Sequence, residues 1–296
     1  MAPPDAPWPD RKMLTLLRHL AIDPTAARHS VPFVGQHSNR RGLSIDPADS
    51  RAYVQGDDLR HLDWGQLAKF DQLVVRLFYA QHAMRVTIAL DCSASMTLGT
   101  PRKFDFARSL AACLSIIALQ GRSEVQLVPS PQGFPQRFVD PSASRGVAMA
   151  DILAKLRALQ AGGVMDIPEL LRRAVRQNSD LLIFISDCLP PRDLTSTFAA
   201  VAAHGRRLIV LHTLCPQEQS PTFRDSVMLR DLETGRRQHI SGSQAAGSAY
   251  HAALERWRHE LLECVTRCGG VYRYISTSTS IEEVLTRNLL EVLITR

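Results

Sequence analysis

A carboxylate and two hydroxyls follow one apolar run of the sequence at alternate positions. In "IALDCSASMT" (residues 88–97), Asp91 is followed by Ser93 and Ser95. Alternate side chains of an extended segment point to the same side, so we expect these three oxygen-bearing groups to converge. Oxygen groups that converge at the end of a buried strand indicate a site for a cation or a phosphate.

A second carboxylate ends another apolar run. Asp187 directly follows "LLIFIS" (residues 181–186). In open α/β sheets, ligands bind at the carboxyl ends of the strands. If the two runs form neighbouring strands, Asp187 shares a crevice with Asp91 and the two serines. A few hydroxyl and carboxylate oxygens suit Mg²⁺, which keeps several of its waters.

The elements that position these residues begin near Arg85. From there, apolar strand-like runs alternate with helical patterns, which predicts a mostly parallel sheet covered by helices on both faces. The predicted strands are residues 85–90, 124–128, 181–186, 207–214 and 271–276. The predicted helices are residues 101–120, 147–159, 167–177, 192–203, 249–268 and 280–293. Residues 226–240 predict a hairpin that turns at Thr234 and Gly235.

The preceding part of the chain has a different pattern. Residues 12–21 have helical spacing, a polar glycine-containing stretch follows, and Leu73–Ala80 reads as a strand. We therefore expect a small N-terminal α+β module over residues 1–84 and an α/β domain over residues 85–296.

Composition places the chain among soluble globular proteins. Of its 296 residues, 45% are hydrophobic and 22% charged. The longest apolar stretch, Leu110–Leu119, is too short to span a bilayer. The first residues lack the basic and apolar regions of a signal peptide. We expect a cytoplasmic protein without a membrane span, whose six cysteines are reduced thiols.

The net charge of +6 and the pI of about 9.2 raise the question of a nucleic-acid partner. The basic residues occur as scattered pairs, and aromatic residues make up only 6% of the chain. Sequence readout and single-strand stacking both need basic and aromatic side chains grouped together. We therefore expect a solvated basic surface and no nucleic-acid partner.

Two motifs together resemble a known family. "DCSAS" (residues 91–95) resembles the Asp-x-Ser-x-Ser motif of von Willebrand factor A domains, which forms their metal ion-dependent adhesion site. The upstream stretch "SRAYVQGDDLRHLDWGQLAKFDQLVVRLF" is similar to the signature of bacterial proteins that carry the domain of unknown function 58. The later "DLETG" segment (residues 231–235) also resembles that family, so the resemblance runs from residue 35 to the end of the chain.

The resemblance implies a Rossmann-like von Willebrand factor A domain with a metal site at the top of its sheet. It implies a non-enzymatic, metal-dependent interaction module that acts as adaptor or chaperone-like partner of a MoxR-type AAA+ ATPase. Ser93 and Ser95 would bind the metal directly, and Asp91 and Asp187 directly or through water. The metal would be Mg²⁺, with Mn²⁺ or Ca²⁺ as alternatives, and a vacant position would take an acidic residue of a client protein.

One position departs from the family pattern. The family loop reads Gly-Gly-Thr, with the Thr hydroxyl as a further ligand, whereas this chain has "AGGVMD" with Val164 in that place. Valine has the shape of threonine without its oxygen, so one ligand is lost. Asp166 would supply an oxygen only if the loop shifts. The alternative is a degenerate site whose serines and aspartates hydrogen-bond backbone amides and a helix N-terminus.

The segment "GDDLRHLDW" (residues 56–64) has two interpretations. In the structural one, its charged residues form caps and ion pairs, with the tryptophan buried beneath them. In the functional one, the same side chains bind a partner directly: Asp57, Asp58, Arg60, Asp63 and Trp64.

The alternative function is a metal-dependent phosphohydrolase-like enzyme that uses Asp91. The residue two positions later is Ser93, where such enzymes carry a second aspartate. The chain also lacks a Gly-x-x-x-x-Gly-Lys phosphate loop and a Gly-x-Ser-x-Gly nucleophile elbow. We therefore predict that the protein is not an enzyme.

Overall fold

The computed structural model of the protein describes residues 8–23, 47–54, 62–78, 84–130, 145–177, 179–189, 193–221, 227–240, 244–290 and 292–295. The chain divides into two units. Unit 1 comprises Met1–Val31 and Met84–Arg296, and unit 2 comprises Pro32–Ala83.

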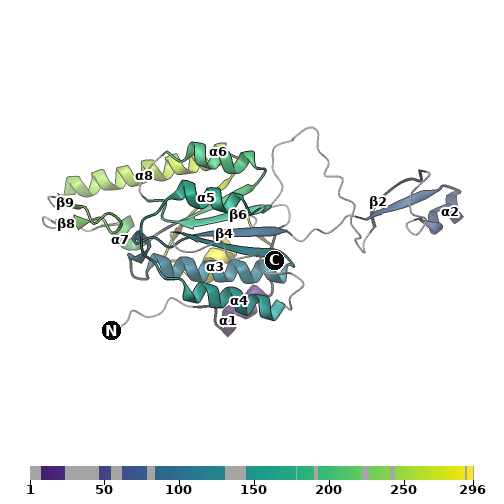
Figure 1. Cartoon of the computed structure of the whole chain (residues 1–296), viewed down its shortest axis with the longest axis horizontal. Helices are drawn as coiled ribbons and strands as arrows, with labels where there is room; N and C mark the ends of the chain where they lie inside the picture. The colour runs from purple at the N-terminus through teal and green to yellow at the C-terminus, as the bar shows by residue number, and fades with distance from the viewer. Residues whose placement is uncertain are drawn as a thin grey trace. The chain divides into compact units, whose positions relative to one another are not determined.

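A five-stranded sheet forms the centre of unit 1, and every strand pair in it is parallel (Figure 1). The strands lie in the order β10-β7-β6-β4-β5. Most of their residues are buried and most of the buried ones are apolar, because helices cover both faces of the sheet. This confirms the predicted α/β fold with a parallel central sheet. The strands are β4 Arg85–Asp91, β5 Glu124–Ser130, β6 Leu181–Ser186, β7 Arg207–Leu214 and β10 Val271–Ser276.

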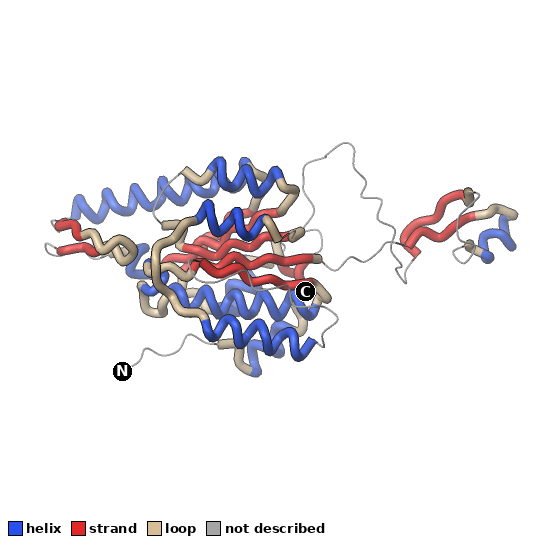
Figure 2. The backbone as a smooth tube through the Cα atoms, viewed as in Figure 1, coloured by secondary structure: helices blue, strands red, loops and turns tan. Residues whose placement is uncertain are grey.

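Two helical layers enclose this sheet (Figure 2). The layer on one face is centred on α3, whose apolar residues are buried on all sides, as expected for a helix enclosed between a sheet and further helices. The opposite layer has its own core around Phe184, Phe198 and Trp257. The first layer contains α1 Arg11–Leu17, α3 Lys103–Gln120, α4 Arg145–Ala158 and α9 Ile281–Glu283. The second contains α5 Ile167–Val175, α6 Thr195–Ala203 and α8 Gln244–Arg267.

The N-terminal segment belongs to the larger unit, although we predicted it within a module of residues 1–84. Leu17, Leu20 and Ile22 are buried in the same core as α3, and this burial explains the difference. Strand β1 (Ala21–Ile22) also pairs antiparallel with β11 (Ile294–Thr295). This pairing joins the N-terminal segment to the last described strand of unit 1.

The C-terminal helix is shorter than predicted. Helix α9 is capped by the hydroxyl of Ser280 and continues as a π-helix over Val284–Asn288. The helical geometry therefore ends at Asn288, before the predicted end at residue 293, and β11 begins at Ile294. None of the helices in the described ranges is long and apolar enough to cross a membrane.

Two further hairpin-like pairs complete the described elements. In unit 2, β2 (Pro47–Ala52) pairs antiparallel with β3 (Val74–Phe78), and α2 (Trp64–Phe70) lies between them in the sequence. In unit 1, β8 (Val227–Arg230) pairs antiparallel with β9 (Arg237–Ile240), which gives the hairpin predicted from the sequence. The short helix α7 (Pro216–Gln219) follows β7 and lies at the same end of unit 1 as this hairpin (Figure 1).

Candidate functional site

Two neighbouring strands carry the predicted site residues. Strands β4 and β6 pair in parallel, with Leu90 opposite Ile185, so Asp91 lies beside Ser186 and Asp187 follows one position later. If the five strands are renumbered by their order in the chain, β4 is strand 1 and β6 is strand 3. Their order across the sheet is then 2-1-3-4-5. The strand order reverses between these two, and ligands of doubly wound sheets bind at such a switch point.

Asp91 and the two serines form one hydrogen-bonded group. The Asp91 side chain is fully buried, and its Oδ1 accepts a 2.8 Å hydrogen bond from the backbone N–H of Ser93. The hydroxyls of Ser93 and Ser95 are 2.9 Å apart. Strand β4 ends at Asp91, and a 3₁₀ turn begins at Ser95, so a bend rather than an extended segment brings the three together.

The carboxyl group of Asp91 is buried among hydrogen-bond donors and a second carboxylate. Its Oδ2 accepts a 2.6 Å hydrogen bond from the hydroxyl of Ser186 at the end of β6. Burial raises the pKa of Asp91 to about 7, with a further contribution from the negative charge of Asp187. Hydrogen bonds from Ser186 and Ser93 oppose this rise. A positive charge near Asp91 would therefore stabilise the ionised carboxylate.

Asp187 takes part in a buried ion triad that the sequence analysis missed. Its Oδ2 lies 2.6 Å from Nζ of Lys103, and Nζ also lies 2.5 Å from Oε1 of Glu218. The Lys103 side chain is fully buried. Burial alone would lower the pKa of Lys103, but the two carboxylates outweigh it and raise this pKa. Lys103 therefore stays charged and neutralises part of the site.

The triad joins three segments that are far apart in the sequence. Lys103 begins α3, Asp187 follows β6, and Glu218 lies in α7. Gly99 lets these segments approach, because its φ is +100° and a Cβ atom there would lie 2.5 Å from that of Cys215. A lysine at the start of a mostly apolar helix was the only sequence signal for the triad.

The loop with the missing threonine lies against the serine segment. The backbone N–H of Gly162 donates to the carbonyl of Cys92, and that of Ala94 donates to the carbonyl of Gly163. Val164 is 56% exposed. Asp166 caps α5 by accepting from the backbone N–H of Glu169, so the structure gives its carboxylate a capping role.

The described residues contain no group of three or more His, Cys, Asp or Glu side chains that could hold a metal ion. A cation at the carboxyl end of β4 would therefore depend on the serine hydroxyls. Cys92 lies beside Asp91, but burial raises the pKa of its thiol to about 12. It is therefore a buried thiol rather than a thiolate ligand.

Comparison with known proteins identifies the family. The family model described as "Protein of unknown function DUF58" matches residues 49–260, which is most of the chain. The chain belongs to the DUF58 family. The match includes both the Asp-Trp segment of unit 2 and the site in unit 1.

Two relatives with curated descriptions are each named an uncharacterized protein. They come from Mycobacterium bovis and Mycobacterium tuberculosis, and each is 25% identical to this chain over 235 residues. That match covers 77% of this chain and 74% of each relative.

Solved structures give weak matches. The conserved hypothetical protein BatB from Bacteroides thetaiotaomicron is 17% identical with a TM-score of 0.41, over 70% of this chain and 97% of that one. An aerotolerance-related membrane protein from Bacteroides fragilis is 15% identical with a TM-score of 0.41, over 69% and 98% of the chains.

The Asp-Trp segment of this DUF58 protein is described in part. Asp57, Asp58 and Arg60 lie outside the described residues. Asp63 caps α2 by accepting hydrogen bonds from the backbone N–H groups of Gly65 and Gln66. The prediction that Trp64 is buried is wrong, because this side chain is 62% exposed at the start of α2.

Exposed apolar side chains lie near the site of this DUF58 protein. Leu98 follows the serine motif and is 41% exposed. The β8–β9 hairpin reaches the Val164 loop, since the backbone N–H of Met165 donates to Oε2 of Glu233 at 3.0 Å. We call the following residues the apolar rim: Leu98, Val164, Met228, Leu229 and Leu232.

Proposed function

We propose that this DUF58 protein is a non-enzymatic protein-interaction module that docks a partner at the carboxyl ends of β4 and β6. The observation that carries the proposal is a fixed polar centre at Asp91, Ser93 and Ser95 with exposed apolar side chains on the adjoining loops. Exposed apolar side chains grouped beside polar ones mark interaction sites.

The polar centre fits a divalent cation such as Mg²⁺. Ligands at right angles on Mg²⁺, with bonds of about 2.1 Å, lie about 3 Å apart. The hydroxyls of Ser93 and Ser95, at 2.9 Å, have this spacing. The site also holds three carboxylates, those of Asp91, Asp187 and Glu218, against the single ammonium group of Lys103. A divalent cation would offset this excess of negative charge.

The two serines would hold the ion, with Asp91 bound directly or through water. When bound, the ion would offer a vacant coordination position to an Asp or Glu of the client protein. Asp187 is occupied by Lys103, and Val164 brings no oxygen, so several ligands would be waters. Mg²⁺ and Mn²⁺ suit so few protein ligands better than Ca²⁺, which takes six to eight oxygens.

The proposal extends to the fold type and to the partner. The strand order and the Asp-x-Ser-x-Ser motif at the switch point support a Rossmann-like von Willebrand factor A domain. On that basis we propose an adaptor or chaperone-like role beside a MoxR-type AAA+ ATPase in the cytoplasm. The client would carry an acidic residue for the cation and apolar side chains for the rim.

The alternative, a phosphohydrolase-like enzyme, has less support. A nucleophilic carboxylate needs to be ionised and accessible, whereas Asp91 is fully buried, and both of its oxygens accept hydrogen bonds. We expect no turnover of generic phosphoesters, esters or peptides by the purified protein. Hydrolysis that disappears in an Asp91→Ala variant would favour the enzyme.

Affinity capture tests the binding function. The immobilised protein is incubated with a purified MoxR-type ATPase and nucleotide, in the presence of either millimolar Mg²⁺ or EDTA. We expect Mg²⁺-dependent capture that Ser93→Ala/Ser95→Ala abolishes and the exposed control Asp151→Asn on α4 preserves. Equal capture by both variants would contradict a role for the polar centre.

A further inference from the structure

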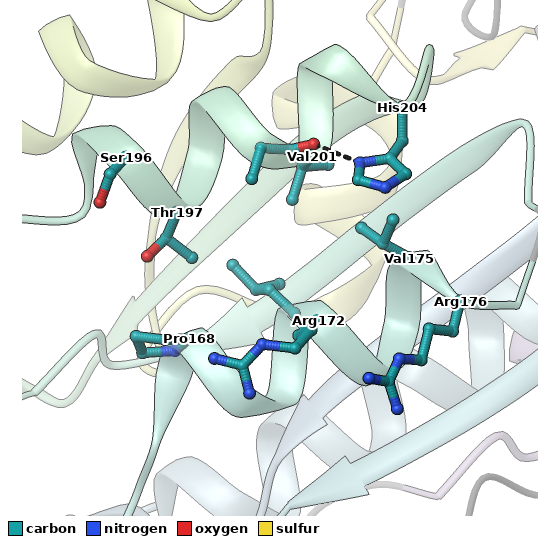
Figure 3. Close-up of a pocket in the computed structure, with 10 residues that line it drawn as sticks. Pro168, Arg172, Val175, Arg176, Ser196, Thr197, Val201 and His204 are labelled. Carbon is teal, nitrogen blue, oxygen red and sulfur yellow. Dashed lines mark hydrogen bonds between the residues drawn. The ribbon is translucent and has the colours of Figure 1, made fainter.

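A hollow of unit 1 lies between α5 and α6, on the outer side of these helices (Figure 3). It has a volume of about 440 Å³. We call it the α5–α6 groove. Its floor is apolar, with Leu171, Val175 and Val201 from the core beneath the two helices. An open apolar hollow of this size is a candidate binding site.

The ionisable side chains that line the α5–α6 groove are all basic. Arg172 and Arg176 extend from α5, one helical turn apart, and His204 stands at the end of α6 (Figure 3). Ser196 and Thr197 bring hydroxyls from α6. Among the described residues, no Asp or Glu lines the groove. Another hollow, of about 610 Å³, differs in this respect, since Glu255, Glu260 and Glu263 line it together with basic residues.

Of the three basic groups, Arg176 is the one open to a ligand, because Nδ1 of His204 lies 2.7 Å from the carbonyl oxygen of Ala200 and Arg172 has a partner on its own helix. Among the described residues, the guanidinium group of Arg176 has no hydrogen bond or ion pair. Arg172 pairs with Glu169 on the exposed surface, three positions earlier in the same helix. Such exposed pairs contribute little, so an incoming carboxylate would displace Glu169 at small cost.

We propose that the α5–α6 groove binds an amphipathic helix of a partner protein with acidic residues beside its apolar face. Charge complementarity identifies the occupant: the apolar face would cover Leu171, Val175 and Val201, and the acidic residues would pair with Arg172 and Arg176. This surface is separate from the cation site, because it lies on the outer side of two helices and not at the strand ends.

The helical walls of the groove favour a helix as the occupant. Each wall is a nine-residue α-helix whose internal backbone groups bond to one another, so an extended peptide would find no free backbone partners. A helix satisfies its own backbone and needs only side-chain contacts. At 1.5 Å per residue, the walls are about 13 Å long and match two to three turns of a bound helix.

A membrane surface is a poorer match. Recognition of anionic lipids usually takes clusters of four to eight Lys or Arg residues. The groove has two arginines and one histidine, and they flank a hollow rather than a flat or convex face. Acidic side chains of one helix, spaced by a turn, match two arginines that are themselves one turn apart.

Selection from a displayed library of random 14-residue peptides on the full-length protein tests the proposal. We expect enriched peptides with Leu, Ile or Phe at helical spacing and Asp or Glu beside them. Their dissociation constants, measured by fluorescence anisotropy, should rise at least tenfold with Arg172→Glu/Arg176→Glu and with Ala200→Trp. Ala200 lines the groove and is exposed, so the added ring fills the hollow without entering the core.

The matched control is Arg230→Glu/Arg237→Glu, which reverses two arginines on the β8–β9 hairpin. Binding should stay within twofold of the unchanged protein. Enriched peptides without acidic residues, or binding that tolerates Ala200→Trp, would overturn the proposal. Two further results would also overturn it, if only the groove variants abolish them. Sedimentation of the protein with phosphatidylglycerol vesicles would make the occupant a lipid surface, and dimer formation would make it a second copy of the chain.

Discussion

Nζ of Lys103 lies 2.6 Å from Oδ2 of Asp187, and neither side chain is exposed. A buried pair of this kind is held by close geometry, and the loss of one partner leaves the other charge without compensation. Here the ammonium group also binds Glu218. Lys103 therefore stabilises this end of the sheet, and it also limits how far the carboxylate of Asp187 can serve as a ligand for a cation.

Replacing Lys103 with methionine should be strongly destabilising. Lys103→Met keeps the length of the side chain but leaves Asp187 and Glu218 without their cation. We expect a loss of about 3–5 kcal/mol in the free energy of unfolding, measured by urea denaturation in EDTA. Millimolar Mg²⁺ should recover part of this loss, because a second positive charge near Asp187 replaces the first.

Lys155→Met is the matched control. Lys155 lies 2.6 Å from Asp151, one turn earlier on α4, but both side chains are partly exposed. We expect a change within about 0.5 kcal/mol, as for other exposed helical pairs. If the two variants lose the same amount, the Lys103 pair does not stabilise the fold.

The Asp91→Asn variant tests the raised pKa of Asp91. An amide can accept from the backbone N–H of Ser93 and donate to Ser186, and it carries no charge to bury. In EDTA at pH 8, we expect the variant to be more stable than the unchanged protein by about 2–4 kcal/mol, since each unit of pKa shift corresponds to about 1.4 kcal/mol.

The sign of the pH dependence follows from the direction of the shift. The pKa of Asp91 rises from 3.8 in the unfolded chain to about 7 in the fold. Below pH 4, both states are protonated and the folded state has no penalty from Asp91. Between pH 4 and 7, the unfolded state loses its proton first, so the stability of the unchanged protein relative to Asp91→Asn falls. A difference that is independent of pH would contradict the shift.

The core of the site was predictable because it depends on local patterns. The apolar runs of β4 and β6 made them central strands, and strand ends are where α/β sheets bind ligands. Asp91, Ser93 and Ser95 lie within five residues, so their proximity needed only the strand end. The register that sets Asp187 beside them follows from strand order, which the sequence left open.

The rest of the site depends on contacts between distant segments. Lys103 and Glu218 are 115 positions apart, and no periodicity links them. Trp64 was predicted as buried because tryptophan is apolar, but Asp63 caps α2 in a way that leaves Trp64 on the exposed side of its first turn. Burial of single aromatic residues in a small module depends on packing that the sequence alone does not specify.

The contact between Glu233 and Met165 should hold the β8–β9 hairpin against the site loop. Replacing Glu233 with alanine removes the acceptor for the backbone N–H of Met165. We expect at least tenfold faster hydrogen exchange at that amide, because a partly buried N–H loses its acceptor, and this hydrogen bond is worth about 1.4 kcal/mol or more.

The control for the hairpin variant is Glu255→Ala. Glu255 is exposed on α8 and pairs with Arg258 in the same helix. Exchange at Met165 should be unchanged in this variant. If Glu233→Ala also leaves exchange at Met165 unchanged, another contact holds the hairpin. The Glu233–Met165 hydrogen bond then gives no ground for placing Met228, Leu229 and Leu232 at the apolar rim.

The Val164→Thr variant tests whether the site lacks one ligand. Threonine has almost the shape of valine, and Val164 is 56% exposed, so the new hydroxyl is solvated and stability in EDTA should change by no more than about 0.5 kcal/mol. If the loop carries a ligand position, the hydroxyl should tighten Mg²⁺ binding about tenfold, which is about 1.4 kcal/mol.

Thermal unfolding with EDTA and with millimolar Mg²⁺ measures this effect, because an ion that binds only the folded state raises the melting temperature. We expect Mg²⁺ to raise it by about 2–4 °C more in Val164→Thr than in the unchanged protein. Val147→Thr on α4, where the valine is 64% exposed, should respond like the unchanged protein. Adding Asp91→Asn should remove the gain, since the ion then loses its carboxylate. If no variant responds to Mg²⁺ or Mn²⁺, the serines and Asp91 serve hydrogen bonding alone, and partner docking has to use the apolar rim without a cation.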